Sequence, residues 1–341
     1  MKNSVLEIFK KLNDKKIYYM IARNYEKFPY FDHDIDLFCD TKLVNLKKIL
    51  INIAKKNGWD CLVYDNHFAD KLNKYSNIEV FHFYKFISGK YECLHLDFFS
   101  GTTLSSLPLI HASEIKRKRK KNFYQIDLAV ENLLRIFTLN TLIMNNDEFK
   151  KGYAIKKIKI YKKKILKYKK KLSFKLYNET FFLNIALNYL KKSNFKKFSI
   201  YVNISRFIYM IKFIFKNPFR SVYYILLRII ELSNHFFFHQ TGLQISFNLK
   251  NPKQKKLIYK SLNLLKNLNF LSYWKIKNIK YFLNIQERKI LERNGAIISI
   301  NSKLKNCVIF DNTRQVTNLL LKKIIKNNQI IYKSPFLNKI Y

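Results

Sequence analysis

Hydrophobic residues in the first hundred positions follow helical spacing in some stretches and strand spacing in others. Apolar residues at positions 5, 8, 9 and 12 lie on one helix face, which predicts a helix over residues 4–12. A second helical pattern ends at Asn57-Gly58, a pair typical of helix C-termini, and predicts a helix over residues 43–56. Strands are predicted over residues 17–22, 34–39, 59–64, 78–86 and 91–99. This order of elements favours an α+β domain over a parallel, doubly wound sheet.

The middle of the chain shows only helical patterns. Helices are predicted over residues 127–145, 155–172 and 179–191, followed by an aromatic-rich stretch over 198–238 that is interrupted at Asn217-Pro218. The helix at 155–172 is amphipathic with an almost wholly basic polar face, which is typical of helices that contact anionic lipid or nucleic acid. The stretch at 198–238 fits either a helical layer between domains or a contact with a membrane surface.

A third pattern begins at Gly242, where strands and helices alternate. Strands are predicted over residues 243–249, 270–276, 296–300, 307–310 and 330–333, and helices over 252–268, 278–293 and 313–326. Such alternation indicates a small α/β unit. The chain is thereby divided into three parts, residues 1–125, 126–240 and 241–341.

Charge separates the first part from the others. The chain holds 65 Lys and Arg against 23 Asp and Glu, a net charge of +42, and it has only 6 Gly and 5 Pro. A general enrichment in Lys, Asn, Ile, Phe and Tyr is also what an AT-rich coding sequence produces. However, residues 1–150 hold 24 basic and 18 acidic residues, which leaves 41 basic and 5 acidic residues for the remainder. Because coding bias does not explain the loss of acids from one half, we expect that half to contact an anionic partner.

Cysteines and apolar runs indicate the compartment. The four cysteines lack metal-binding spacing, so we expect reduced thiols at Cys39, Cys61, Cys93 and Cys307. The N-terminal segment is amphipathic and lacks the apolar core of a signal peptide. No uncharged apolar run reaches the ~18–20 residues that a membrane-spanning helix requires. We therefore expect a cytoplasmic protein, either free in the cytoplasm or peripheral at the inner membrane face.

The strongest chemical signal is a pair of carboxylates, Asp34 and Asp36, on a predicted strand. Residues two apart on a strand project to the same face, so these side chains lie side by side. Neighbouring carboxylates repel each other unless a cation or a proton lies between them, and hard oxygen ligands suit Mg²⁺ or Mn²⁺. Asp97, on a later predicted strand, is the expected third ligand. His95 shares a face with Asp97 and is a candidate to support that carboxylate or to contact substrate.

Several basic residues follow the predicted strands. Residues 116–121 read KRKRKK, and such a run is typical of a solvated loop or helix face. A surface that contacts phosphates is the functional alternative.

These residues together resemble a known family. The sequence IARNYEKFPYFDHDIDLF places DIDL nine residues after Arg23-Asn24, and HLDFF carries Asp97. This arrangement resembles the nucleotidyltransferase fold of the DNA polymerase β superfamily, whose signature is hG[G/S], nine to thirteen residues, Dh[D/E]h and a third acid on a later strand. The N-terminal stretch is also similar to bacterial nucleotidyltransferase-like proteins that occur in surface-polysaccharide loci. The resemblance covers about residues 15–150.

The resemblance implies a fold and a set of roles. The expected fold is an α+β nucleotidyltransferase-like N-terminal domain, a helical middle region and a small α/β C-terminal unit. Asp34, Asp36 and Asp97 would be the catalytic and metal-binding residues. Arg23 and Asn24 stand where the family has a Gly-Ser pair that binds nucleotide phosphates. Some relatives carry a C-terminal kinase-like domain, but here no G-x-x-x-x-G-K-[S/T] occurs, so a kinase-like unit would be degenerate.

Two functions remain open at this point. The first is a nucleotidyltransferase that uses Mg²⁺ or Mn²⁺ to move a nucleoside monophosphate from an NTP to a hydroxyl or phosphate acceptor. The acceptor would be a glycan or a small molecule, and the resemblance implies a role in surface-glycan biosynthesis. The second is a catalytically inactive nucleotidyltransferase-like module that binds an anionic membrane or RNA. A nucleic-acid enzyme is less favoured, because the downstream motifs of tRNA nucleotidyltransferases do not occur.

Overall fold

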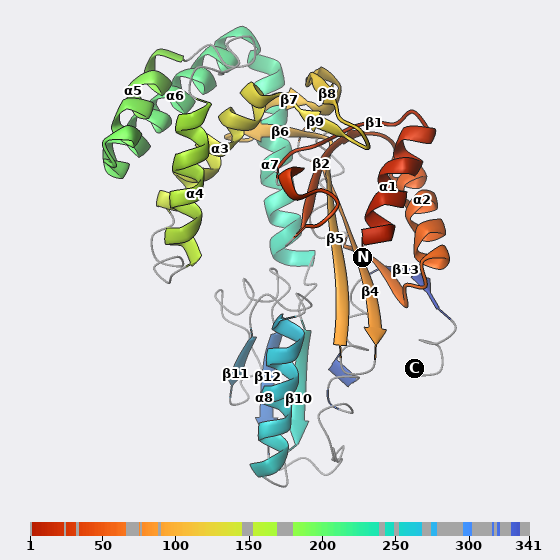
Figure 1. The fold of residues 1–341 in the computed structure, drawn as a ribbon. Helices are drawn as coiled ribbons and strands as arrows, with labels where there is room; N and C mark the ends of the chain where they lie inside the picture. The colour runs from red at the N-terminus through yellow and green to blue at the C-terminus, as the bar shows by residue number, and fades with distance from the viewer. Residues whose placement is uncertain are drawn as a thin grey trace.

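The fold is taken from a computed structural model of the chain (Figure 1). It describes residues 2–23, 25–31, 34–65, 75, 77–87, 90–144, 153–168, 180–238, 243–248, 252–267, 274–277, 296–301, 316, 319–320 and 329–334. The predicted helix at 278–293, the predicted strand at 307–310 and Asn24 lie outside these residues, as does most of the predicted helix at 313–326.

A mixed sheet forms the centre of the described chain. Its eight strands follow the order β13-β3-β4-β5-β2-β1-β9-β8. Two neighbouring pairs, β2 with β5 and β1 with β9, are parallel, and the others are antiparallel. The architecture is therefore compatible with the predicted α+β class. The strands are β1 (Tyr18–Ile21), β2 (Ile35–Asp40), β3 (Cys61–Asp65), β4 (Ile78–Ile87), β5 (Lys90–Phe99), β8 (Arg117–Arg119), β9 (Tyr124–Ile126) and β13 (Gln329–Lys333).

Two helices, α1 (Lys2–Asp14) and α2 (Leu43–Lys56), cover one face of this sheet (Figure 1). Their apolar faces pack on inward-facing strand residues to form the main core. The bounds of α2 are those predicted from the sequence. Gly58 has a φ of 62°, and the Trp59 amide bonds back to the Ala54 carbonyl at 3.0 Å, so the helix ends where the Asn-Gly pair predicted.

The opposite face of the sheet packs on α3 (Leu128–Met144) and a small hairpin of β6 (Gly101–Leu104) and β7 (Leu107–His111). A second core fills this side, formed by Met20, Phe38, Ile110, Ala112, Ile115, Ile126 and Val130. The carboxylates of interest lie on this face of the sheet.

Helices continue from α3 into a layer beside the sheet (Figure 1). α3, α4 (Tyr153–Lys167), α5 (Thr180–Lys191) and α6 (Phe195–Lys216) share a third hydrophobic core. α7 (Pro218–Phe238) begins at the proline that was predicted to interrupt the aromatic-rich stretch. It packs on β7 through Tyr224 and Leu227.

The C-terminal region contains a second, smaller sheet. Its strands β10 (Leu243–Asn248), β12 (Ala296–Asn301) and β11 (Trp274–Lys277) are parallel in that order. α8 (Pro252–Asn267) follows β10, and the Trp274 indole donates a hydrogen bond to Asn263 at 3.3 Å. Parallel strands with a helical connection match the expected α/β unit.

Two predictions need correction. The last predicted strand, at 330–333, was assigned to the C-terminal unit, but β13 pairs antiparallel with β3 in the large sheet. The basic run at 116–121 is largely exposed, as a solvated run should be, but its centre forms β8, the edge strand beside β9, and not a loop or helix face. Within it, the Arg117 guanidinium lies 4.0 Å from the ring centre of Tyr18 and 3.8 Å from that of Tyr124, so packing engages this residue.

Candidate metal centre

Three carboxylates from two neighbouring strands meet at one point of the sheet. Asp36 on β2 lies directly opposite Asp97 on β5, because the two strands pair in parallel with these residues in register. Asp34 comes two residues before Asp36, just ahead of β2. One carboxylate oxygen from each residue lies within 4.8 Å of the others. The structure therefore brings together the three acids that the sequence singled out.

The alternation of side chains along β2 places the carboxylate of Asp36 on the face of the sheet opposite α1 and α2. Ile35 and Leu37 belong to the core beneath α1 and α2, whereas Phe38 belongs to the core on the opposite face. Since residues 36 and 38 share a face, Asp36 points to the same side as Phe38. The residue is nonetheless 3 % exposed, so its carboxylate is removed from bulk water.

Arg23 is the counter-ion of Asp36. Its Nε forms an ion pair with Asp36 Oδ2, and its Nη1 donates to the Tyr161 hydroxyl of α4 at 3.2 Å. Burial lowers the pKa of Arg23, but the charge of Asp36 and the hydrogen bond to it outweigh that effect and raise the pKa. Burial also raises the pKa of Asp36 above its ordinary value, although Arg23 opposes this shift. The pair keeps Arg23 charged and partly compensates the desolvation of Asp36.

The second carboxylate oxygen of Asp36 has no such compensation. Asp36 Oδ1 is buried and has no hydrogen-bond partner among the residues that the structure describes. A buried, unpaired carboxylate oxygen is costly, because the group has lost its hydration without gaining a donor or a cation. Three carboxylates against one guanidinium also leave an excess of negative charge. A hard divalent cation such as Mg²⁺ or Mn²⁺ fits both the oxygen donors and this excess charge.

A pair of histidines lies beside the carboxylates. His95 Nε2 is 2.8 Å from Asp97 Oδ1, and the His82 ring on β4 lies 4.3 Å from the His95 ring, centre to centre. Burial lowers the pKa of His95, but the hydrogen bond and charge of Asp97 outweigh it and raise the pKa. Burial lowers the pKa of His82 well below its ordinary value, so His82 is held neutral. His95 therefore fixes the orientation of the Asp97 carboxylate, and His82 packs behind it.

The turn after Arg23 is anchored by a buried polar network. The Tyr25 hydroxyl donates to Glu131 Oε2 at 2.6 Å and accepts from Gln125 Nε2 at 2.7 Å. Glu131 also forms an ion pair with Arg135 one helical turn later in α3. Outside this network, Lys164 of α4 reaches Glu26 at 2.8 Å. The loop that carries Arg23 is thus tied to α3 and α4, which limits its freedom to move away from Asp36.

Sequence reasoning found the acids but missed most of their surroundings. Arg23 was expected to contact phosphate, and the ion pair that it forms with Asp36 was not expected. Tyr161, Glu131 and His82 were not singled out, because each reaches the site through packing between elements that are distant in sequence. The one local hint was on β4, where His82 lies between Phe81 and Phe83.

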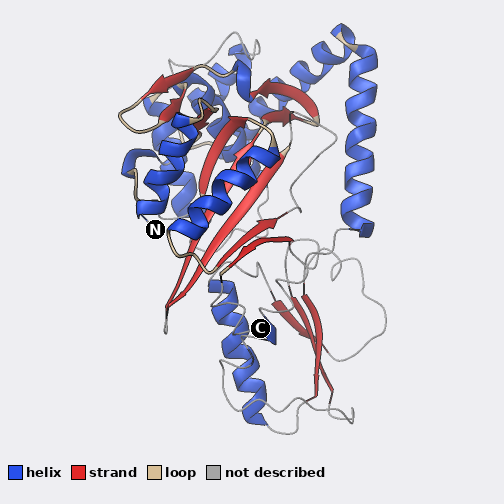
Figure 2. Ribbon diagram, turned by 90° about the vertical axis from the view of Figure 1, so that its right-hand side faces the viewer, coloured by secondary structure: helices blue, strands red, loops and turns tan. Residues whose placement is uncertain are grey.

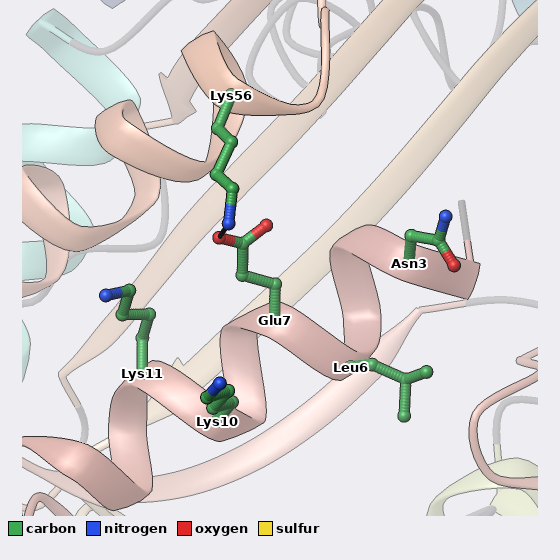
Figure 3. A pocket seen from close by; sticks show the side chains of 6 residues that line it. All are labelled: Asn3, Leu6, Glu7, Lys10, Lys11 and Lys56. Carbon is green, nitrogen blue, oxygen red and sulfur yellow. Dashed lines mark hydrogen bonds and ion pairs between the residues drawn. The ribbon is translucent and has the colours of Figure 1, made fainter.

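A separate hollow on the surface has a different character. It has a volume of about 340 Å³ and lies along α1 and the end of α2, lined by Asn3, Leu6, Glu7, Lys10, Lys11 and Lys56 (Figure 3). Glu7 is the one acid among these residues, and Lys56 already pairs with it at 2.7 Å. The Asp36 carboxylate faces away from α1 and α2. We therefore place the candidate site at the three carboxylates and not in this hollow.

Comparison of the chain with protein-family models, with curated proteins and with solved structures finds no match.

Proposed function

We propose that the chain is a metal-dependent nucleotidyltransferase whose site is formed by Asp34, Asp36 and Asp97. The observation that supports this most directly is the buried Asp36 Oδ1, which lacks a partner among the described residues while two further carboxylates lie beside it. The parallel pairing of β2 with β5 holds two of these acids in register. The resemblance of the same residues to the nucleotidyltransferase signature supplies the reaction class.

The three carboxylates would hold Mg²⁺ or Mn²⁺. When bound, such an ion polarises phosphate oxygens and stabilises the leaving pyrophosphate. Asp97 is oriented by His95 and is the candidate to accept the proton of the acceptor group. Arg23 favours the ionised form of Asp36, and its side chain is 32 % exposed, so it is also a candidate to contact a phosphate group. Asn24, the other proposed phosphate contact, lies outside the described residues.

The substrates follow from the resemblance and belong to the proposal. The donor would be an NTP and the acceptor a hydroxyl or phosphate on a glycan or small molecule. A role in surface-glycan biosynthesis is the biological setting that the resemblance favours.

Metal binding is tested separately from transfer. The thermal unfolding midpoint of the parent chain should rise with Mg²⁺ or Mn²⁺, and the shift should disappear in Asp36→Asn, because the metal loses a charged ligand. Asp40→Asn is the matched control, since Asp40 lies on the same strand but is exposed and outside the cluster. An equal metal-induced shift in Asp36→Asn would contradict the assignment of the ligands.

Transfer is then measured with each NTP by the release of pyrophosphate in the presence of acceptor extracts. Asp34→Asn and Asp36→Asn should each abolish turnover while far-UV circular dichroism stays unchanged. Retained turnover in purified Asp36→Asn protein would refute the proposed reaction.

A second candidate is a catalytically inactive module of the same fold. The ion pair between Arg23 and Asp36 favours it, because a guanidinium already occupies one oxygen of the central ligand. In that case the parent chain would show no metal-induced shift, and Arg23→Gln would not restore one. A metal-dependent shift in the parent chain, together with turnover, selects the enzyme.

A further inference from the structure

One face of α7 is apolar and exposed. Helical positions three and four apart line up along it, and their side chains are Phe219, Val222, Tyr223, Leu226, Ile229 and Ile230. We call these six residues the α7 stripe. Leu226, near its middle, is 53 % exposed. Such periodicity is what a helix shows when it buries one face against a partner.

Among the residues that the structure describes, none covers this face of α7. α7 packs on β7 and α6 through a different side, where Ser221, Tyr224 and Leu227 are buried. α7 is the long helix at the right of Figure 2, standing apart from the sheet. The helix therefore has two apolar faces, one used inside the protein and one open. A contiguous apolar surface of this kind typically marks an interaction site.

The stripe begins at a basic and aromatic corner. Phe215 at the end of α6 is 82 % exposed and Phe219 at the start of α7 is 90 % exposed, the highest values among the exposed large hydrophobic residues described. Lys216 and Arg220 lie next to them in the chain and are also exposed. We call these four residues the α6–α7 corner. From α4 to α7 the helices carry fifteen Lys and Arg and one acidic residue, Glu231.

We propose that the α6–α7 corner and the α7 stripe form a docking surface for an anionic lipid membrane. Phe215 and Phe219 enter the boundary between headgroups and acyl chains, and Lys216 and Arg220 contact the lipid phosphates. The α7 stripe then lies along the membrane and buries its aliphatic side chains. Both properties of the surface, apolar area and positive charge, are thereby satisfied by one partner.

Charge and side-chain chemistry argue against the other occupants. A second copy of the chain would bring another net charge of +42, so self-association through this basic region is opposed by repulsion. The phosphates of RNA would pair with the Lys and Arg side chains, and its bases would stack on the aromatic rings. However, Val222, Leu226 and Ile229 offer RNA bases neither stacking nor hydrogen bonds.

Among the described residues, α6 is the one helix long and apolar enough to cross a membrane. Phe198 and Val202 of α6 are fully buried in the core shared with α3 and α5. Crossing the bilayer would require α6 to leave that core. The exposed corner instead favours a position along the membrane surface, and this proposal does not depend on the function of the three carboxylates.

The test is flotation of the full chain with vesicles. Binding to vesicles of equal parts phosphatidylglycerol and phosphatidylcholine should exceed binding to phosphatidylcholine alone. Phe219→Ser combined with Leu226→Gln should weaken binding at least about tenfold, since two side chains lose their transfer into the lipid. Val44→Gln is the matched control, because Val44 is an exposed apolar residue of α2 on a different part of the molecule, and it should bind like the parent. Lys216→Gln combined with Arg220→Gln should remove most of the preference for the anionic vesicles.

A second measurement separates insertion from simple adsorption. Phe219→Trp should give a blue-shifted emission on addition of the anionic vesicles, relative to the parent chain with its two tryptophans. Unchanged emission, or unweakened binding by the stripe variant, would overturn the proposal. It would equally be overturned if the stripe variant lost RNA binding while vesicle binding stayed at the parent level. Conversion of a lipid-free dimer to a monomer by the same variant would assign the surface to a second copy.

Discussion

The large sheet and the α6–α7 helices each contain residues in an environment that does not suit them, but in opposite senses. In the sheet, apolar residues such as Leu37 and Leu96 are fully buried, and the exception is polar: Asp36 is buried with one oxygen unpaired among the described groups. In the helices, Lys216 and Arg220 are exposed as expected, and the exception is apolar: Phe219 and Leu226 lie open to water.

In both regions a side chain lies in an environment that costs free energy, and a bound partner would remove that cost. The buried carboxylate oxygen without a donor supports the proposed cation, whereas the exposed apolar row supports the proposed membrane contact. Both exceptions lie beside buried hydrophobic residues, Phe38 next to Asp36 and Tyr224 and Leu227 on the other side of α7. The two regions therefore serve as controls for each other.

The largest expected effect on the free energy of unfolding comes from replacing one leucine by alanine in each of the two regions. Leu37→Ala should lower the free energy of unfolding by about 3 kcal/mol or more, because it leaves a cavity in the main core. Leu226→Ala should change it by less than about 0.5 kcal/mol, since the side chain is mostly solvated. Urea denaturation measures both. A large loss in Leu226→Ala would show that the α7 stripe is covered by the protein itself.

A somewhat smaller effect is expected at the buried acid. Arg23→Ala removes the counter-ion of Asp36, and because Arg23 is partly exposed we expect a loss of about 2–3 kcal/mol. The double variant Arg23→Ala with Asp36→Asn should recover much of this loss, since no buried charge remains. Thermal and urea denaturation of the four proteins form a double-mutant cycle. Additive losses would mean that the ion pair does not stabilise the fold.

A third effect concerns the polar network behind the Arg23 loop. Tyr25→Phe removes the hydroxyl that joins Glu131 to Gln125, and it should cost about 1–2 kcal/mol because both partners lose a hydrogen bond. If the network positions Arg23, the variant should also weaken the metal-induced shift. Tyr30→Phe, at an exposed tyrosine, is the control and should leave both quantities unchanged.

The smallest effect is expected at the surface of α1 and α2. A hydrogen bond from Lys56 lowers the pKa of Glu7, although burial acts in the opposite direction (Figure 3). A lowered pKa means that the ion pair stabilises the fold above the ordinary value of 4.5 and that this stability is lost as the pH falls through the folded-state pKa. Glu7→Gln should cost about 0.5 kcal/mol at neutral pH. The difference from the parent should shrink in acid, and a constant difference would assign it to packing.

Local patterns predicted the elements well. The helix at 43–56 agrees with α2 at both ends, because its apolar period and the Asn-Gly pair are both local signals. The proximity of Asp34 to Asp36 likewise follows from their spacing of two residues at the start of a strand. The break at Pro218 and the start of α8 at Pro252 rest on the same kind of local evidence.

Pairings between distant segments could not be predicted in this way. The register that sets Asp36 against Asp97, and His82 against His95, depends on how whole strands align. The contact of Tyr161 with Arg23 depends on the packing of α4. The centre of the basic run at 116–121 forms a strand because pairing with β9 and stacking of Arg117 on two tyrosines outweigh the repulsion between its charges. Exposure of the α7 stripe was undecidable from its pattern, which is the same for a buried and for an open helix face.

The pairing of β13 with β3 has a consequence for synthesis of the protein. Until Gln329–Lys333 has left the ribosome, the outer edge of β3 has no neighbouring strand from this pair. The two strands are separated by more than 260 residues, which take on the order of 10–50 s to translate at about 5–20 residues per second. During that interval an unpaired strand edge is open to other chains. Fragments ending before Gln329 should therefore aggregate more readily than the full chain.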